Sequence, residues 1–167
     1  RLDAAIDRAM EALNTSVDVD SALWREDIAG SVAHARGLAR AGVISADEAE
    51  ALVAGLGQVA AEIERGEMVW DRAKEDVHMN IEARLTAIVG SVGGKLHTAR
   101  SRNDQIATDL RLYCRRRAQE TLAALDDLGR AVVAQAEREI DTLMPSYTHL
   151  QRAQPSRLSH HLMAWQE

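Results

Sequence analysis

The chain has 167 residues, of which 46% are hydrophobic and 3% aromatic, and its formal net charge is −6. This length suits one domain or one and a half, and the acidic balance gives no attraction for nucleic acid or an anionic membrane surface, so we expect neither partner. With the single cysteine Cys114, no signal-peptide pattern and no apolar run near the roughly 20 residues of a bilayer span, we expect a cytoplasmic protein without disulfides or a thiolate metal cluster.

Apolar residues at helical spacing, in a sequence without Phe and with two prolines, predict an all-α fold. The expected helices cover approximately residues 2–13, 22–41, 46–65, 75–90, 105–143 and 156–167. Ser45 and Glu48 have the spacing of a capping box before the third helix. The segment "NTSVDVD" before the second helix is expected to be a loop that ends in a helix cap at Asp20 or Ser21.

The fifth predicted helix is much longer than the others. From Gln105 to Leu143 the sequence has no proline and one glycine. A helix of this length would measure about 55–60 Å, more than the preceding helices can cover. We therefore expect a small N-terminal helical domain over residues 1–103, followed over 104–167 by the start of a central bundle of long helices. The covering helices are expected from other subunits or from further sequence, so the chain is expected to be a fragment of a longer polypeptide.

The connector "KLHTARSRNDQ", residues 95–105, is rich in hydrogen-bond donors and precedes the long helix. The free N–H groups and the dipole of a helix N-terminus favour an anion, and Arg102 can bind a carboxylate through two parallel hydrogen bonds. Ser101 and Asn103 add neutral donors, which fits a pocket for a carboxylate-bearing substrate. On the residues alone, a solvated loop in which Ser101 and Asp104 cap the helix is the commoner arrangement.

Two further polar segments contain histidines. The segment "SYTHLQRAQP" places Thr148 and His149 between two predicted helices, where an imidazole could act as an acid or base near neutral pH. The segment "EDVH" places Asp76 and His78 near a helix start. The alternative for both segments is a solvated histidine without a function, with Asp76 complementing the helix dipole.

Two signatures in combination resemble a known family. The segments "KLHTARSRNDQIATDLRLY" and "MPSYTHLQRAQP" are similar to the argininosuccinate lyase family of the fumarase/aspartase superfamily. The resemblance continues through "NTSVDVDSALWREDIAGSVAHARGLARAGVIS" and "EDVHMNIEARL", so it covers nearly the whole chain. Related lyases that act on fumarate, aspartate or adenylosuccinate differ in the first signature, which makes the pair specific.

Two positions depart from the family pattern, which usually has glycine where Ala99 and Ser146 stand. Because alanine takes a positive φ only at a cost, we expect a conventional backbone conformation at Ala99. The family's third signature is a mobile loop with the serine that is usually given the proton-abstracting role. It would lie beyond Glu167, so the chain alone is expected to be inactive.

The resemblance implies β-elimination of argininosuccinate to arginine and fumarate, in arginine biosynthesis, without a metal or an organic cofactor. It implies that His149 is an acid/base residue, and it leaves open which proton His149 handles. The implied substrate-binding residues are Ser16, Asp20, Arg102, Asn103 and Thr148. The implied supporting residues are Asp76, His78, Ser101 and Gln154. Preorganised donors would stabilise the dianionic carboxylate that proton removal creates, and an imidazole suits the protonation of the departing nitrogen.

The resemblance also implies a homotetramer in which each active site combines the signatures of three subunits. His149 would then serve a different site from Asn103 of the same chain. Three alternatives remain open: a sibling lyase with another fumarate-yielding substrate, a structural protein like the δ-crystallins, and an unrelated helical interaction module. The intact signatures argue against a lost active site.

Overall fold

The computed structural model describes residues 8–167, so the start of the first predicted helix, residues 2–7, lies outside the described residues. The chain divides into two compact units, one up to Cys114 and one from Arg115 to Glu167, and each is treated by itself. The division falls within helix α6, and the expected domain boundary at residues 103/104 remains a prediction.

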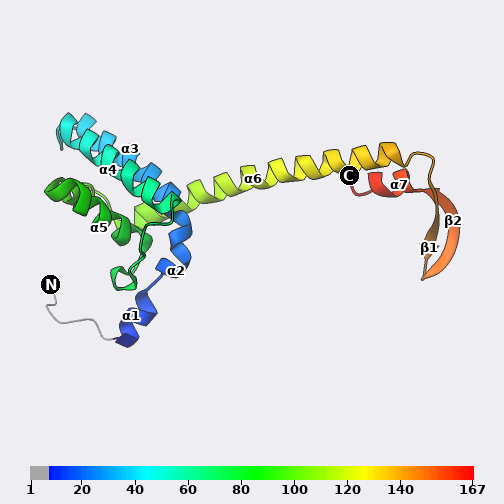
Figure 1. Ribbon diagram of the computed structural model, residues 1–167, viewed down its shortest axis with the longest axis horizontal. Coiled ribbons are helices and arrows are strands. Elements are labelled where there is room, and N and C mark those ends of the chain that lie inside the picture. Colours follow the sequence, from blue (N-terminus) through cyan, green and yellow to red (C-terminus); the bar gives the residue numbers. More distant parts are fainter. Residues whose placement is uncertain (1–7) are drawn as a thin grey trace. The chain divides into compact units, whose positions relative to one another are not determined.

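The prediction of an all-α fold is confirmed, apart from one small hairpin (Figure 1). The helices are α1 (Arg8–Asn14), α2 (Val17–Asp20), α3 (Trp24–Arg40), α4 (Ala46–Glu64), α5 (Val77–Val89), α6 (Arg102–Arg138) and α7 (Leu158–Met163). Three 3₁₀ turns span Ser21–Leu23, Arg72–Lys74 and Gly90–Lys95, and the strands are β1 (Leu143–Thr148) and β2 (Gln151–Arg157).

The predicted boundaries of α4 are confirmed by hydrogen bonds. The backbone N–H of Glu48 donates to Ser45 Oγ over 3.2 Å, and the Ser45 N–H donates to Glu48 Oε2 over 3.0 Å, which completes the capping box. Gly66 follows the helix with a φ of +71°, a left-handed conformation that glycine adopts without a steric penalty.

The segment "NTSVDVD" was wrongly expected to be a loop with a helix cap. Val17 to Asp20 form one helical turn that continues through a 3₁₀ turn into α3, so the chain has no free helix start for Asp20 to cap. Asp20 instead accepts a hydrogen bond from the backbone N–H of Val77, the first residue of α5, over 3.0 Å. A side chain distant in sequence therefore completes the start of α5.

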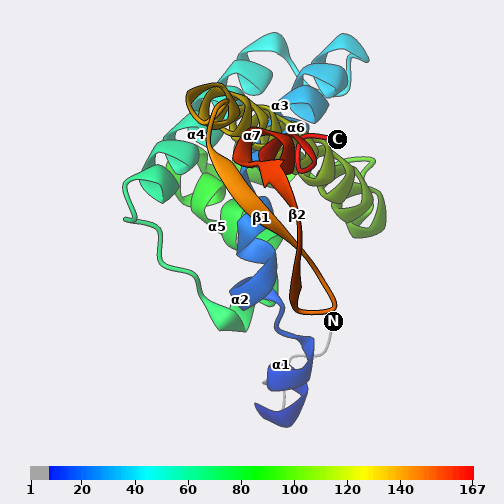
Figure 2. The same cartoon turned by 90° about the vertical axis from the view of Figure 1, so that its right-hand side faces the viewer.

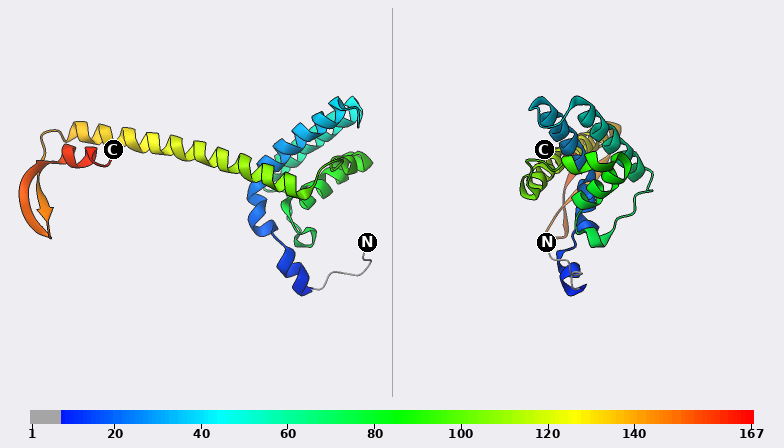
Figure 3. Two further views of the ribbon diagram at one scale, coloured as in Figure 1. Left: turned by 180° about the vertical axis from the view of Figure 1, so that it is seen from behind. Right: turned by 90° about the vertical axis from the view of Figure 1, so that its left-hand side faces the viewer.

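Helices α3, α4 and α5 pack together around an aliphatic core, and α3 and α4 lie side by side in Figure 3. Leu52, Leu56 and Leu85 have no exposed surface, and Leu96 closes the core from the connector before α6. Burying side chains of this size contributes about 1.5–3 kcal/mol each, so the core can form without aromatic residues. The tryptophans Trp24 and Trp70 pack only at its margin.

Two adjacent glycines after α5 have different surroundings. A Cβ atom on Gly93 would lie 2.7 Å from the Cα atom and 2.6 Å from the Oγ1 atom of Thr86, too close to be accommodated without backbone movement. A Cβ atom on Gly94 would meet nothing within 4 Å. Only the first glycine is therefore required for the packing of the Gly90–Lys95 turn on α5.

We predict that Gly93→Ala lowers the free energy of unfolding by about 1–3 kcal/mol, because overpacking against a fixed backbone has this cost. The matched variant Gly94→Ala should change it by less than about 0.5 kcal/mol. Denaturant titration followed by circular dichroism measures both values, and equal effects of the two substitutions would contradict the packing argument.

Helix α6 has 37 residues, or about 55 Å at 1.5 Å per residue, which confirms the predicted long helix. Much of its apolar stripe is exposed in this chain, including Ile106, Leu110, Leu122, Leu125 and Leu128. Among residues 8–167, no helix combines the length and the apolar content that a bilayer crossing requires.

The prediction that the long helix extends to Leu143 and is followed by a loop is wrong. Helix α6 ends at Arg138, and a β-hairpin follows it. Strands β1 and β2 form an antiparallel hairpin with its turn at His149 and Leu150, which have φ values of +51° and +61° (Figure 2). Two consecutive left-handed residues are typical of a type I′ turn, which usually carries Asn or Gly. Because His149 and Leu150 are neither, the sequence does not predict this turn. Helix α7 begins at Leu158 rather than directly after Pro155, because Pro155 pairs with Pro145 in the hairpin.

Candidate active site

Ser16 and Asp20 lie together against the start of α5. The Ser16 hydroxyl donates to Asp20 Oδ2 over 2.6 Å, while Asp20 Oδ1 accepts from the Val77 N–H over 3.0 Å. The backbone N–H groups of Ser16 and Val17 also donate to the Glu75 carbonyl. Two candidate substrate-binding residues are thereby fixed beside Asp76, a candidate supporting residue.

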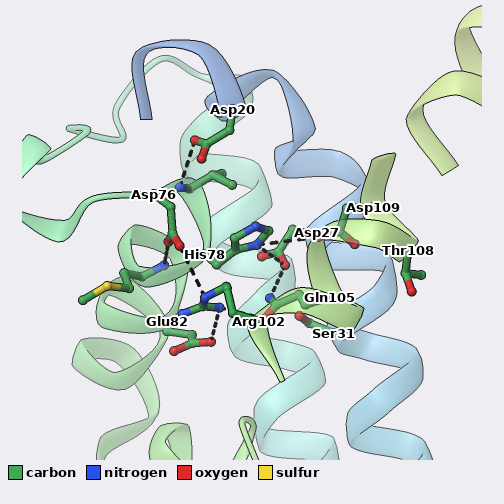
Figure 4. Close-up of polar contacts among 12 residues, drawn as sticks. Asp20, Asp27, Ser31, Asp76, His78, Glu82, Arg102, Gln105, Thr108 and Asp109 are labelled. Carbon is green, nitrogen blue, oxygen red and sulfur yellow. Dashed lines mark hydrogen bonds and ion pairs between the residues drawn. The ribbon is translucent and has the colours of Figure 1, made fainter. Parts of the chain in front are cut away.

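Asp76 caps α5 by accepting a hydrogen bond from the Met79 N–H over 2.7 Å. Its other carboxylate oxygen lies 3.3 Å from Arg102 Nε, at the start of α6 (Figure 4). The positive end of the α5 dipole stabilises the carboxylates of Asp20 and Asp76. The structure thus brings together Ser16, Asp20, Asp76 and Arg102, which come from three separate segments of the sequence.

The Arg102 guanidinium is held by partners of its own unit. Its Nη1 atom donates to Glu82 Oε1 over 3.0 Å and to Gln105 Oε1 over 2.7 Å, and Nε faces Asp76. The Nη2 atom has no hydrogen-bond partner within the described part of the chain. The side chain is 26% exposed, so a ligand can approach it.

Ser101 and Asn103 lie at the first turn of α6 with exposed side chains. The Asn103 N–H donates to Ser101 Oγ over 3.2 Å, and the Ser101 N–H donates to Asp104 Oδ2 over 2.9 Å. Ser101 and Asp104 therefore cap the helix, as the residues alone suggested. The Asn103 side chain projects from this turn and has no side-chain hydrogen bond within residues 8–167.

The prediction of a conventional backbone conformation at Ala99 is wrong, because its φ is +56°, in the left-handed region. The chain turns here between the 3₁₀ segment that ends at Lys95 and the capped start of α6, and it keeps the left-handed conformation despite the Cβ atom. Such a conformation costs about 1–2 kcal/mol for a residue other than glycine.

We predict that Ala99→Gly raises the free energy of unfolding by about 0.5–1 kcal/mol. It relieves the left-handed strain, while the greater freedom of glycine in the unfolded chain offsets part of this gain. The control Ala107→Gly, on an exposed face of α6, should lower stability by about 1 kcal/mol. Denaturant titration of both variants checks the opposite signs, and a loss of stability in Ala99→Gly would refute the strain.

A buried polar cluster joins α3, α5 and α6 behind these residues. His78 Nδ1 lies 2.9 Å from Asp27 Oδ1 and 3.6 Å from Asp109 Oδ2. All three side chains are at most 1% exposed, which refutes the alternative of a solvated His78. Gln105, also buried, donates its amide N–H to the same Asp27 oxygen.

The three titratable groups shift one another's pKa values. Burial, followed by the charge of Asp27, raises the pKa of the Asp109 carboxyl to about 7. Burial opposes ionisation of Asp27, but His78, the hydrogen bond from Gln105 and the charge of Arg100 together outweigh it and lower the pKa of Asp27. Burial also opposes the His78 imidazolium, but the hydrogen bond to Asp27 and the charges of Asp27 and Asp76 together raise the pKa of His78. These shifts favour the ionised form of Asp27, the charged form of His78 and the protonated form of Asp109, and that combination has no net charge.

The same three side chains offer donor atoms within 4.8 Å of one another, close enough for a metal ion. Asp27 Oδ1 already accepts hydrogen bonds from His78 and Gln105, and the charge of Arg100 acts on both carboxylates. A divalent cation would have to displace these donors, whereas a proton on Asp109 fits among them. The donor set therefore favours a proton over a metal ion.

We predict that Asp109→Asn removes a pH dependence of stability. In the folded protein Asp109 keeps its proton up to about pH 7, whereas in the unfolded chain it loses the proton near pH 4. Its contribution to the free energy of unfolding should therefore fall as pH rises from about 4 to 7, and stay level above. Denaturant titrations across this range should show the wild type losing stability relative to the variant, and parallel curves would refute the buried acid.

Asp27, Gln105 and Asp109 were missed by the sequence reasoning, although a signal was present. Asp27 lies on the face of α3 that carries the buried Ser31 and Ala35 at successive four-residue steps. Gln105 and Asp109 are four residues apart on α6 and buried, whereas the neighbouring apolar residues are exposed. Polar residues spaced four apart on one face of α3 and of α6 therefore mark the faces where these helices pack together.

The remaining candidates lie in the unit that begins at Arg115. Thr148 ends β1 and His149 occupies the hairpin turn, and both are exposed. Gln154 is exposed on β2, where the register shifts so that Ala153 and Gln154 stand opposite Ser146, as in a β-bulge. The hairpin presents Thr148 and His149 at its tip.

Comparisons with known proteins agree with these signatures. The lyase family matches residues 1–167. The chain is 50% identical over its whole length to an argininosuccinate lyase from Syntrophotalea carbinolica, and 54% identical over 96% of its length to one from Desulfatibacillum aliphaticivorans. It spans 36% and 35% of the lengths of these two relatives.

Solved structures give the same fold. An EDDS lyase in complex with formate has a TM-score of 0.71 and 31% identity, over 93% of this chain and 30% of its own. A fumarate lyase:delta crystallin from Brucella melitensis has a TM-score of 0.75 at 19% identity, over 95% of this chain and 42% of its own, and supports the fold alone. With the family matched from the first residue to the last, the chain belongs to the lyase family.

Proposed function

We propose that this chain is the N-terminal part of an argininosuccinate lyase, which cleaves argininosuccinate into arginine and fumarate. The observation that carries the proposal is the convergence of Ser16, Asp20, Asp76 and Arg102 at the start of α5, in a chain half identical to argininosuccinate lyases. The activity would serve arginine biosynthesis in the cytoplasm.

Argininosuccinate has carboxylates and a guanidino group, and the candidate residues offer hydrogen-bond partners for each kind of group. Ser16 and Asp20 provide acceptors for the cationic arginine end, with Asp76 as a supporting carboxylate. Arg102, Asn103 and Thr148 provide donors for the carboxylates, and Ser101 and Gln154 support their segments. Such donors stabilise the dianion that forms when a base removes the proton beside a carboxylate. The C–N bond then breaks, a C=C bond forms, and the departing nitrogen takes up a proton, for which His149 is suited.

The exposed apolar stripe of α6 supports assembly into a homotetramer with a central helical bundle. Leu122, Leu125 and Leu128 are all more than half exposed in this chain, and long helices with such stripes are normally buried against others. In that assembly the hairpin with His149 would complete the site of another subunit. A small-molecule substrate and other copies of the chain are the partners, with no metal or organic cofactor.

We predict that His149→Asn in the full-length protein lowers kcat for fumarate release by about 10²–10⁴-fold, the contribution of general acid–base catalysis. The control His160→Asn alters an exposed histidine of α7 and should retain turnover. Fumarate absorbance measures the rate, and light scattering checks that the tetramer is intact.

Unchanged turnover in His149→Asn would contradict the assignment of His149. Absence of turnover in the wild type would favour a structural protein of the δ-crystallin kind, and turnover of another succinyl compound in preference to argininosuccinate would favour a sibling lyase. Calorimetry that detects no binding of argininosuccinate would contradict the proposed substrate. The 167-residue chain alone should show no turnover, because it spans only about a third of the length of the lyases that it matches.

A further inference from the structure

Asp27 is the point at which three helices of the N-terminal unit are joined. It lies on α3, it accepts a hydrogen bond from His78 Nδ1 on α5, and it accepts another from the Gln105 amide on α6 (Figure 4). A buried carboxylate is tolerated when donors satisfy it, and here both donors meet the same oxygen atom. The position of Asp27 therefore fixes two side chains at once.

Gln105 connects Asp27 to Arg102 by hydrogen bonds. Its amide nitrogen donates to Asp27, and its amide oxygen accepts from Arg102 Nη1 over 2.7 Å. An amide is the side-chain group that can donate on one side and accept on the other without a charge. The opposite orientation would place the amide oxygen against Asp27 and the NH₂ group against the guanidinium, so the amide has one favourable orientation.

The guanidinium is then held on three sides. Gln105 and Glu82 occupy Nη1, Asp76 faces Nε, and Nη2 is left for a ligand. Without the bridge from Gln105, the guanidinium can rotate to satisfy Asp76 and Glu82 in other ways. The hydrogen bond to Gln105 therefore determines which guanidinium nitrogen is free to bind a ligand.

We propose that Asp27 and Gln105 are positioning residues of the lyase site: Asp27 orients Gln105 and His78, and Gln105 directs one edge of the Arg102 guanidinium toward the substrate. This inference rests on the proposed function. Neither residue touches the substrate, and both act through side chains that the site uses.

The pKa of His78 depends on Asp27 and on the other charged groups around the imidazole. Asp27 faces the imidazole from α3, Asp109 and Arg102 from α6, and Asp76 from α5. Burial has the largest single effect and lowers the pKa of His78, but the hydrogen bond to Asp27 and the charges of Asp27 and Asp76 together raise it. Asp27→Asn removes this charge without changing the shape, so His78 should titrate at a lower pH than in the wild type.

The test uses three variants of the full-length protein. Gln105→Met keeps the length and removes both hydrogen bonds, and kcat/KM for argininosuccinate should fall about 10–100-fold, mainly through KM, as expected for a misplaced binding group. Gln105→Glu should lose a similar factor at pH 7.5, since its carboxylate faces Asp27. The control Gln58→Met alters an exposed glutamine of α4 and should retain the wild-type value.

The pH dependence separates positioning from structural support. At lower pH the carboxyl of Gln105→Glu takes up a proton and regains the donor and acceptor of an amide, so its kcat/KM relative to wild type should recover about tenfold by pH 5.5. Gln105→Met should show no recovery. Parallel pH profiles for the two variants, or losses that match a reduced fraction of folded tetramer, would overturn the proposal.

A measurement without turnover keeps the inference separate from the proposed function. The NMR titration of His78, assigned with His78→Asn, should move to lower pH in Asp27→Asn. If the wild type lacks argininosuccinate turnover, the proposed function fails, while this titration still tests the role of Asp27. An unchanged His78 titration would overturn that role.

Discussion

The hydrogen bonds of the Asp27 carboxylate to His78 and Gln105 fix how three helices meet in the N-terminal unit. Removing a carboxylate from water is costly, and the cost is recovered only if α5 and α6 bring their donors to the right place. The aliphatic core between α3, α4 and α5 provides most of the burial, but apolar contacts do not specify a register. The polar cluster therefore specifies the geometry, and the core provides the stability.

The candidate substrate residues depend on this arrangement. Asp20 and Asp76 are bound to backbone N–H groups at the start of α5, and Arg102 is held between α5 and the first turn of α6. Because these contacts join segments far apart in the sequence, a small shift of α6 would separate the carboxylates from the guanidinium.

Local signals in the sequence predicted most helices, and tertiary contacts determined the rest. The capping box of Ser45 and Glu48 and the length of α6 follow from spacing alone. The hairpin turn at His149 was missed because it lacks the residues that such turns prefer, and its strands are mostly exposed. Ala99 was expected to avoid a left-handed conformation, yet its neighbours on both sides are anchored and impose it. For the candidate site, the sequence suggested the residues that gather at the start of α5 and at the first turn of α6, whereas Asp27, Gln105 and Asp109 required the packing of three helices to be known.

The sequence separation of the cluster has a consequence for synthesis on the ribosome. Asp27 is 51 residues from His78 and 78 residues from Gln105. The helices α3, α4 and α5 can collapse as they emerge, but the Asp27 charge lacks one of its donors until the first turns of α6 have left the exit tunnel. Because domains form as units during translation, the nascent N-terminal unit would remain incompletely closed until that moment. A pause in elongation after Asp109 has left the exit tunnel would give this unit time to close before the following part of the chain emerges.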